Sequence, residues 1–96
     1  MTEPNPEMPT GLRLVRTTPE FDETSIPTGL RGSHKVAAGV WGRVVIRSGS
    51  IDFVFDDDPR TSRSLVAGET QPIPPERVHH LQVSGPVTLV IEFYAT

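Results

Sequence analysis

The sequence predicts an all-β domain, built as a closed barrel or a sandwich. Short β-prone runs recur at near-regular spacing, glycine- and proline-rich turns separate them, and no stretch shows sustained 3.6-residue periodicity. The 96 residues suffice for one core only, because two smaller cores would not offset the conformational entropy of folding. We therefore expect one domain over residues 11–96, preceded by a disordered tail over residues 1–10 whose three prolines disfavour regular backbone hydrogen bonding.

The first predicted elements are an edge strand and a turn. The run over residues 12–17 is β-prone and ends near Pro19, which is typical of an edge strand. Residues 25–30 read as a turn, because Pro27 presets φ and Gly29 can adopt a positive φ two positions later.

The clearest strand pair covers residues 40–47 and 50–55. The second run alternates apolar and polar residues, and Ser48-Gly49 between two β-branched runs predicts a hairpin. Three adjacent carboxylates, Asp56 to Asp58, and then Pro59 must leave the sheet, because like charges repel and proline cannot donate to a ladder. A solvated loop is expected there, since the run lacks the spaced ligands of a calcium loop.

The last two strands, over residues 79–83 and 87–94, are predicted to form a second hairpin around Ser84-Gly85-Pro86. Period-2 alternation on the first of them points His79 inward and His80 outward. An inward neutral imidazole serves as a metal ligand, a general base or a hydrogen-bonded core residue, and the spacing leaves all three open.

Composition limits both the chemistry and the partners. The chain has no cysteine, which leaves any metal to histidine and carboxylate ligands. A formal charge of −3 with scattered arginines excludes a phosphate-binding stripe, so no nucleic-acid partner is expected. The sequence has no export signal and no run long enough to cross a bilayer, so we expect a cytoplasmic protein with no membrane partner.

The segment ending at His79 resembles the second cupin motif, in which a glycine, a proline, a second glycine and a metal-binding histidine follow one another. Gly68, Pro74 and His79 have that spacing. The chain departs from the motif at two positions: Glu76 replaces the second glycine, and Val83 stands where the motif has asparagine.

The first cupin motif is matched less well. Gly49 fits its closing glycine, but Gly42 stands where its glutamate ligand would be, and no His-x-His pair precedes it. His34 is the one upstream histidine that could act as a ligand, slightly out of phase.

Together these segments resemble the TehB/YeaR-like domain family, small proteins or domains associated with tellurite resistance. The resemblance spans the chain from about Pro19 to its end. The matching stretches are Ile26–Leu30 leading to His34, Gly39–Gly42, Ser48-Gly49, Ile73–His79 and Ile91–Tyr94. The resemblance implies a single cupin-like double-stranded β-helix (jelly-roll) barrel and a divalent metal, zinc or iron, but no particular reaction.

The sequence supports three functions. In the first, His34 and His79 bind a divalent metal, completed by Glu92 or a water, in a tellurite or related stress response; a vacant coordination position would permit catalysis. Glu92 is the least secure ligand, because the apolar residues alternate with it and argue that it faces outward. The second function is a non-catalytic module that binds a small molecule or anion, and the third is a homodimeric structural barrel.

Overall fold

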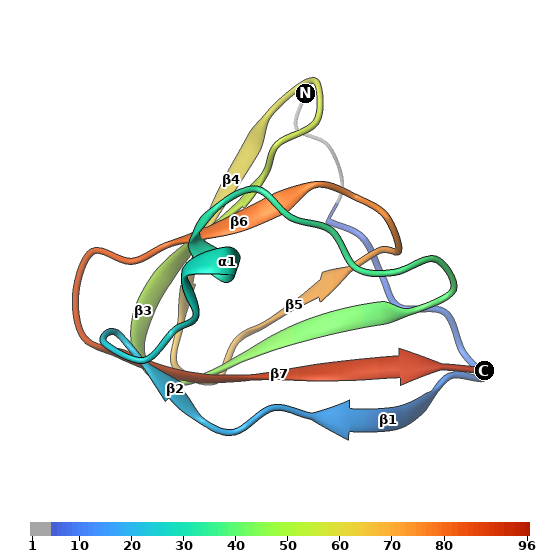
Figure 1. The fold of residues 1–96 in the computed structure, drawn as a ribbon, viewed down its shortest axis with the longest axis horizontal. Coiled ribbons are helices and arrows are strands. Elements are labelled where there is room, and N and C mark those ends of the chain that lie inside the picture. The colour runs from blue at the N-terminus through green and yellow to red at the C-terminus, as the bar shows by residue number, and fades with distance from the viewer. Residues whose placement is uncertain (1–4) are drawn as a thin grey trace.

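In residues 5–96, which the computed structural model describes, the chain forms antiparallel β-strands and a single helical turn (Figure 1). The elements in chain order are β1 (Arg13–Thr17), β2 (Phe21–Asp22), α1 (Thr28–Arg31), β3 (Trp41–Phe55), β4 (Thr61–Val66), β5 (Thr70–Ile73), β6 (His79–Gln82) and β7 (Val87–Ala95). The all-β prediction is confirmed. The segment predicted as a turn over residues 25–30 contains the start of α1 instead of a turn alone.

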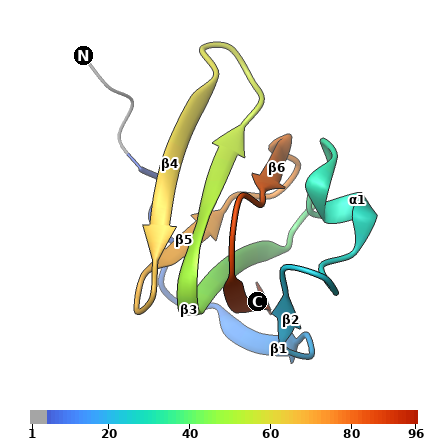
Figure 2. The same cartoon turned by 90° about the vertical axis from the view of Figure 1, so that its left-hand side faces the viewer.

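The long strand β3 organises the sheet, because both of its sides are paired along most of its length. On one side β5 pairs with residues 42–45 of β3 and β4 with residues 50–55. On the other side β7 pairs with residues 41–49 and β6 with residues 52–55. The result is a three-stranded antiparallel ribbon that bends near the middle of β3 (Figure 2).

Both predicted hairpins are wrong, because their turn sequences are bends in this ribbon. Ser48-Gly49 lies inside β3, and Ser84-Gly85-Pro86 joins β6 to β7, which pair with different halves of β3. Gly49 has a φ of 72°, and a Cβ there would lie 2.0 Å from the carbonyl oxygen of Pro86. Glycine is needed where the two bends touch, because any side chain would collide with the neighbouring backbone.

The N-terminal part of the chain forms a further flank of the ribbon. β1 and β2 pair with β7, and the backbone of His34 pairs with that of His79 in β6. β1 stands at one end of the strand order β1-β7-β3-β4, which confirms the predicted edge strand. This flank brings His34, distant in sequence, beside the start of β6.

One hydrophobic core lies inside the bend, and Phe53 is its largest fully buried side chain. Alternation along β3 and β7 places Val44, Ile46, Leu89 and Ile91 in this core. The strand order ends at β1 and β4 and does not close on itself, so a single closed barrel is not confirmed.

The predicted tail over residues 1–10 is described only in part. Residues 1–4 lie outside the described residues, and residues 5–10 contain no strand or helix. Asn5 is nevertheless in contact with the domain, because its Oδ1 accepts a hydrogen bond of 2.7 Å from Nε2 of the buried Gln71.

Candidate metal centre

His79 enters the core from the first position of β6. It pairs with Phe55 on β3, its side chain is 2% exposed, and its ring stacks on that of Phe53 with centroids 5.4 Å apart. The inward orientation expected from alternation is therefore confirmed. An imidazole in this position is shielded from water on the side covered by the Phe53 ring.

His34 reaches the same face through a single pair of backbone hydrogen bonds. The amide of each histidine donates to the carbonyl oxygen of the other at 2.9 Å, and residues paired in this way in antiparallel strands point to the same side. The two ring centroids are 4.2 Å apart with an interplanar angle of 62°. The structure thus brings together the two histidines that the sequence analysis singled out.

Both imidazole rings are oriented by a hydrogen bond from Nδ1 to a backbone carbonyl oxygen. Nδ1 of His79 donates to the carbonyl oxygen of Arg77 at 2.8 Å, and Nδ1 of His34 donates to that of Gly32 at 2.9 Å. A carbonyl oxygen only accepts, so Nδ1 carries the proton in each ring and Nε2 of the neutral ring keeps its lone pair. This is the arrangement found in histidine ligands of metals, whose other nitrogen is fixed by a backbone or carboxylate oxygen.

The electrostatics of His79 favour the neutral form. Burial lowers the pKa of its imidazole from 6.5 to about 4, because the charged ring would lose its hydration; the hydrogen bond to the Arg77 carbonyl opposes this shift, and nearby His34 adds to it. At neutral pH His79 therefore presents a lone pair and not a proton at Nε2.

Glu92 belongs to a different cluster. Its Oε1 is 2.7 Å from Nη2 of Arg43 and accepts a hydrogen bond of 2.9 Å from the Tyr94 hydroxyl. It pairs with Arg43 across β3 and β7, on the side of the strands opposite to the core. Within residues 5–96 no group of three or more histidine and carboxylate side chains is placed to hold a metal ion.

A second histidine cluster lies on the outer side of β6. Nδ1 of His80 donates to Oδ2 of Asp56 at 2.7 Å, and the Ser33 hydroxyl donates to the same oxygen at 3.1 Å. Burial acts to raise the pKa of Asp56, but the hydrogen bonds from His80 and Ser33 outweigh it and hold that pKa below 3.8. The pattern of residue types hid this role, because Asp56 opens a run of three carboxylates that is typical of a solvated loop.

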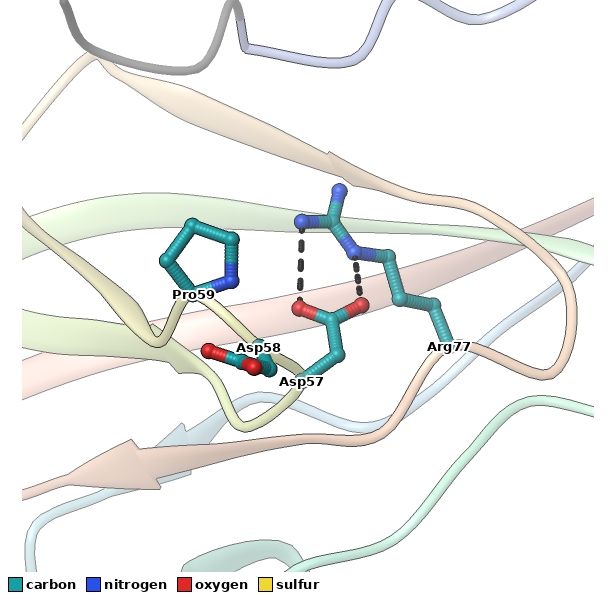
Figure 3. Close-up of a pocket in the computed structure, with 4 residues that line it drawn as sticks. All are labelled: Asp57, Asp58, Pro59 and Arg77. Atoms are coloured by element: carbon teal, nitrogen blue, oxygen red, sulfur yellow. Dashed lines mark hydrogen bonds and ion pairs between the residues drawn. The ribbon is translucent and has the colours of Figure 1, made fainter.

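The rest of that acidic run borders an open notch of about 290 Å³ between Asp57, Asp58, Pro59 and Arg77 (Figure 3). The Arg77 guanidinium forms two hydrogen bonds to the Asp57 carboxylate, at 2.7 and 3.3 Å, and lies 3.7 Å from the centroid of the Phe55 ring. These charged groups already satisfy one another. The expected loop is confirmed, with an ion pair at its surface.

The bent antiparallel ribbon, with His34 and His79 side by side, defines a small all-β protein. The model of the TehB-like domain matches residues 16–91, and the chain belongs to this family. The TehB/YeaR-like resemblance drawn from the sequence is therefore confirmed. Glu76 supports the alignment with the second cupin motif, because it takes a φ of 61° at the position where the motif has glycine.

Several solved structures share the fold, among them the following three. TehB from Haemophilus influenzae superposes with a TM-score of 0.82 at 16% identity, over 93% of this chain and 33% of that one. A protein from Escherichia coli strain K12 gives a TM-score of 0.82 at 20% identity, over 94% and 96%. A cupin-2 domain protein from Shewanella frigidimarina gives 0.55 at 21%, over 84% and 66%. The chain thus spans about a third of the TehB chain.

No curated protein matches the chain. Among the described residues, no helix is long and apolar enough to span a membrane.

Proposed function

We propose that this protein is a small cupin-like metal-binding protein in which His34 and His79 hold one divalent ion, zinc or iron, inside a jelly-roll type of fold. The observation that carries the proposal is the pair of inward rings, 4.2 Å apart, each with Nδ1 bound to a backbone carbonyl and Nε2 left as a ligand. Imidazole nitrogen suits zinc and ferrous iron, and the sequence offers no thiolate.

The surroundings of the two rings support ligation. The carbonyl oxygens of Gly32 and Arg77 fix the tautomers, and burial keeps His79 neutral, so a metal need not displace a proton from its Nε2. The Phe53 ring covers one face of His79 and keeps water from that side. Two protein ligands leave the other coordination positions to water or to a small molecule.

A divalent metal with open positions supplies Lewis acidity and lowers the pKa of a bound water. The contribution of this chain is to orient the two imidazoles through their Nδ1–H groups and to exclude water from the core side. A catalytic role therefore depends on a small molecule reaching the open side of the His34–His79 pair.

Elemental analysis of untagged protein, purified without chelator, tests the proposal directly. We expect about one metal per chain in the wild type, by the logic of one site. His34→Ala and His79→Phe should lose it; phenylalanine keeps the size and apolar burial of the ring next to Phe53, so the second variant should stay folded. His80→Gln is the matched control, since it replaces an adjacent histidine on the other side of β6 and should retain the metal.

Glu92→Gln separates the pair from the three-residue site that the sequence suggested. Its carboxylate is engaged by Arg43 and Tyr94, so we expect unchanged metal content. A wild-type protein that neither zinc nor ferrous iron can load would contradict the proposal and leave the non-catalytic ligand-binding module as the better function.

We propose a tellurite or related stress response as the setting, and only the family membership of the chain supports this part. The test is tellurite tolerance of a deletion strain carrying the wild type or the His34→Ala variant. If the wild type restores tellurite tolerance and the His34→Ala variant does not, tolerance depends on the histidine pair. Equal tolerance of the strain with and without the gene would contradict it.

A further inference from the structure

The two candidate metal ligands are supported unequally by the fold. His79 belongs to β6, whereas His34 lies in the loop that follows α1 and runs beside β6 (Figure 1). The ring of His34 is oriented by its Nδ1 bond to the carbonyl oxygen of Gly32, two residues earlier in the same loop. The direction of the His34 ring therefore depends on how this loop is fixed to the rest of the domain.

Ser33 lies between Gly32 and His34 and fixes the loop on its outer side. His34 and His79 face each other in an antiparallel register. The same register sets Ser33 opposite His80. Successive residues of an extended chain point to opposite sides, so Ser33 and His80 both lie on the side away from the two ligand rings. Each candidate ligand thus has its immediate neighbour on the outer side.

The Asp56 carboxylate joins these two neighbours. Its Oδ2 accepts hydrogen bonds from Nδ1 of His80 at 2.7 Å and from the Ser33 hydroxyl at 3.1 Å. Asp56 directly follows β3, and its amide donates to the carbonyl oxygen of Val78 at 2.9 Å, so the carboxylate projects from a backbone that is itself anchored. The side chains of His80 and Asp56 are 11% and 17% exposed, so water competes weakly for the bond between them.

We propose that Asp56 is a positioning residue, which holds the imidazole of His34 beside that of His79 by way of Ser33. The carboxylate ties the outer side of the loop to β6, and the inner side of the loop then carries the His34 ring to 4.2 Å from the His79 ring. The inference rests on the proposed function, because its consequence is tighter binding of the divalent metal. Groups that orient metal ligands in this way contribute roughly 10- to 100-fold to the metal affinity.

This role differs from attraction of the metal by a negative charge. Asp57 follows Asp56 and carries the same charge, but its carboxylate is bound to Arg77 instead of to the loop that carries His34. Ser33 is uncharged, yet its hydroxyl is the group that connects the loop to the carboxylate. Charge and position can therefore be separated with variants of Ser33, Asp56 and Asp57.

Titration of metal-free protein with zinc, in competition with a chelator of known affinity, tests the proposal. Asp56→Ala and Ser33→Ala should each raise the dissociation constant of zinc by about tenfold, while the stoichiometry at saturation stays that of the wild type. Ser33→Thr keeps the hydroxyl and should bind zinc as the wild type does. The double variant should be no weaker than Asp56→Ala alone, because both substitutions remove the same hydrogen bond.

Asp57→Ala is the charge-matched control for Asp56→Ala. It removes the same charge from the adjacent position and leaves the bonds of Ser33 and His80 in place, so its zinc affinity should stay close to that of the wild type. Equal weakening by the Asp56 and Asp57 variants would assign the effect to charge and overturn the inference.

Metal-free protein gives a second readout that needs no bound ion. The contact between the rings of His34 and His79 should produce a nuclear Overhauser effect between their protons. The effect should weaken in Ser33→Ala and Asp56→Ala and return in Ser33→Thr. A general loss of structure would also change the amide signals of β3 and β7, which should stay as in the wild type.

Failure of the inference and failure of the proposed function give different results. A wild type that binds zinc no more tightly than Ser33→Ala and Asp56→Ala would overturn the inference and leave the His34–His79 metal site standing. A wild type that neither zinc nor ferrous iron can load would overturn the proposed function. The ring contact in metal-free protein then decides the inference by itself, and an Overhauser effect of unchanged strength in both alanine variants would overturn it.

Discussion

His79 and His80 are neighbours on β6, and both are buried, yet they have opposite surroundings. His79 faces Phe53 and His34, and its Nδ1 donates to a neutral backbone carbonyl. His80 lies on the other side of the strand, and its Nδ1 donates to the carboxylate of Asp56. Burial keeps the first ring neutral, and the second ring donates its hydrogen bond to a negatively charged group.

The face of the strand decides these two roles. Among apolar and aromatic groups, ionisation of His79 is penalised because burial outweighs the opposing effects of the Arg77 carbonyl and Asp56. On the other face, Asp56 connects His80 of β6 with Ser33, next to His34 in sequence. His79 presents a lone pair on the core side, while His80 is linked through Asp56 to the segment that carries His34.

Removal of the Phe53 ring, which covers the buried His79, should have the largest effect on stability. Phe53→Ala deletes a fully buried ring from the core and should lower the free energy of unfolding by about 3–5 kcal/mol. The loss of apolar cover should also raise the pKa of His79 toward 6.5. Urea unfolding and an NMR titration of the histidine rings measure the two effects.

The matched control is Val66→Ala, because Val66 is half exposed and its loss should change stability by no more than about 0.5 kcal/mol. A loss below about 1 kcal/mol for Phe53→Ala, by contrast, would mean that the stacked ring contributes little to the core.

The second-largest effect should be a loss of stability on acidification, caused by protonation of His79. In metal-free protein the pKa of His79 is 6.5 when unfolded and about 4 when folded, so on acidification the unfolded chain binds the proton first. The contribution is fully present above pH 6.5 and is lost as the pH falls to about 4. At about 1.36 kcal/mol per pKa difference of one, about 3 kcal/mol should disappear over this range.

Urea unfolding at pH steps between about 7 and 4 measures this loss, with chelator present. His79→Phe cannot be protonated and should flatten the curve in that interval. An unchanged slope in His79→Phe would assign the dependence to other groups and not to burial of this ring.

The strands were predictable from the sequence, but their partners were not. The β-prone runs and their alternation gave correct positions for β3, β6 and β7 and the correct direction of His79. Ser48-Gly49 between two such runs has the composition of a hairpin turn, yet the chain continues through it. Its glycine is needed because the Pro86 carbonyl approaches it, and a contact between two distant bends leaves no trace in either local sequence.

The candidate site shows the same limit. His34 and His79 could be paired only through their positions relative to a family pattern, since 44 residues of chain separate them and no periodicity connects them. Alternation correctly turned Glu92 outward, but Arg43 and Tyr94 as its partners follow from strand register alone. Asp56 was hidden because its neighbours Asp57 and Asp58 make the run look uniformly solvated.

Removal of the Asp56 carboxylate should destabilise the surroundings of His80, because this group accepts the hydrogen bond from His80. Asp56→Ala leaves the Nδ1–H of the nearly buried His80 and the Ser33 hydroxyl without their acceptor, which should cost about 1–2 kcal/mol of stability. The folded pKa of Asp56 is depressed, so this stabilisation is present above pH 3.8 and is lost as the pH falls further. The difference between wild type and variant in urea unfolding should therefore shrink in strong acid; a difference that stays constant would exclude the carboxylate charge as its source.

Replacement of the adjacent Asp57 should have the smallest effect on stability, and it provides a direct comparison with Asp56. Asp57 accepts two hydrogen bonds from Arg77, but its side chain is 43% exposed, and exposed ion pairs contribute little because water screens them. Asp57→Ala should lower stability by about 0.5 kcal/mol, since Arg77 keeps its contact with the Phe55 ring. Equal losses for the Asp56 and Asp57 variants in urea unfolding would mean that the acidic run acts as one solvated cluster. A loss at Asp56 alone would instead locate the stabilisation in the link between β6 and the segment carrying His34.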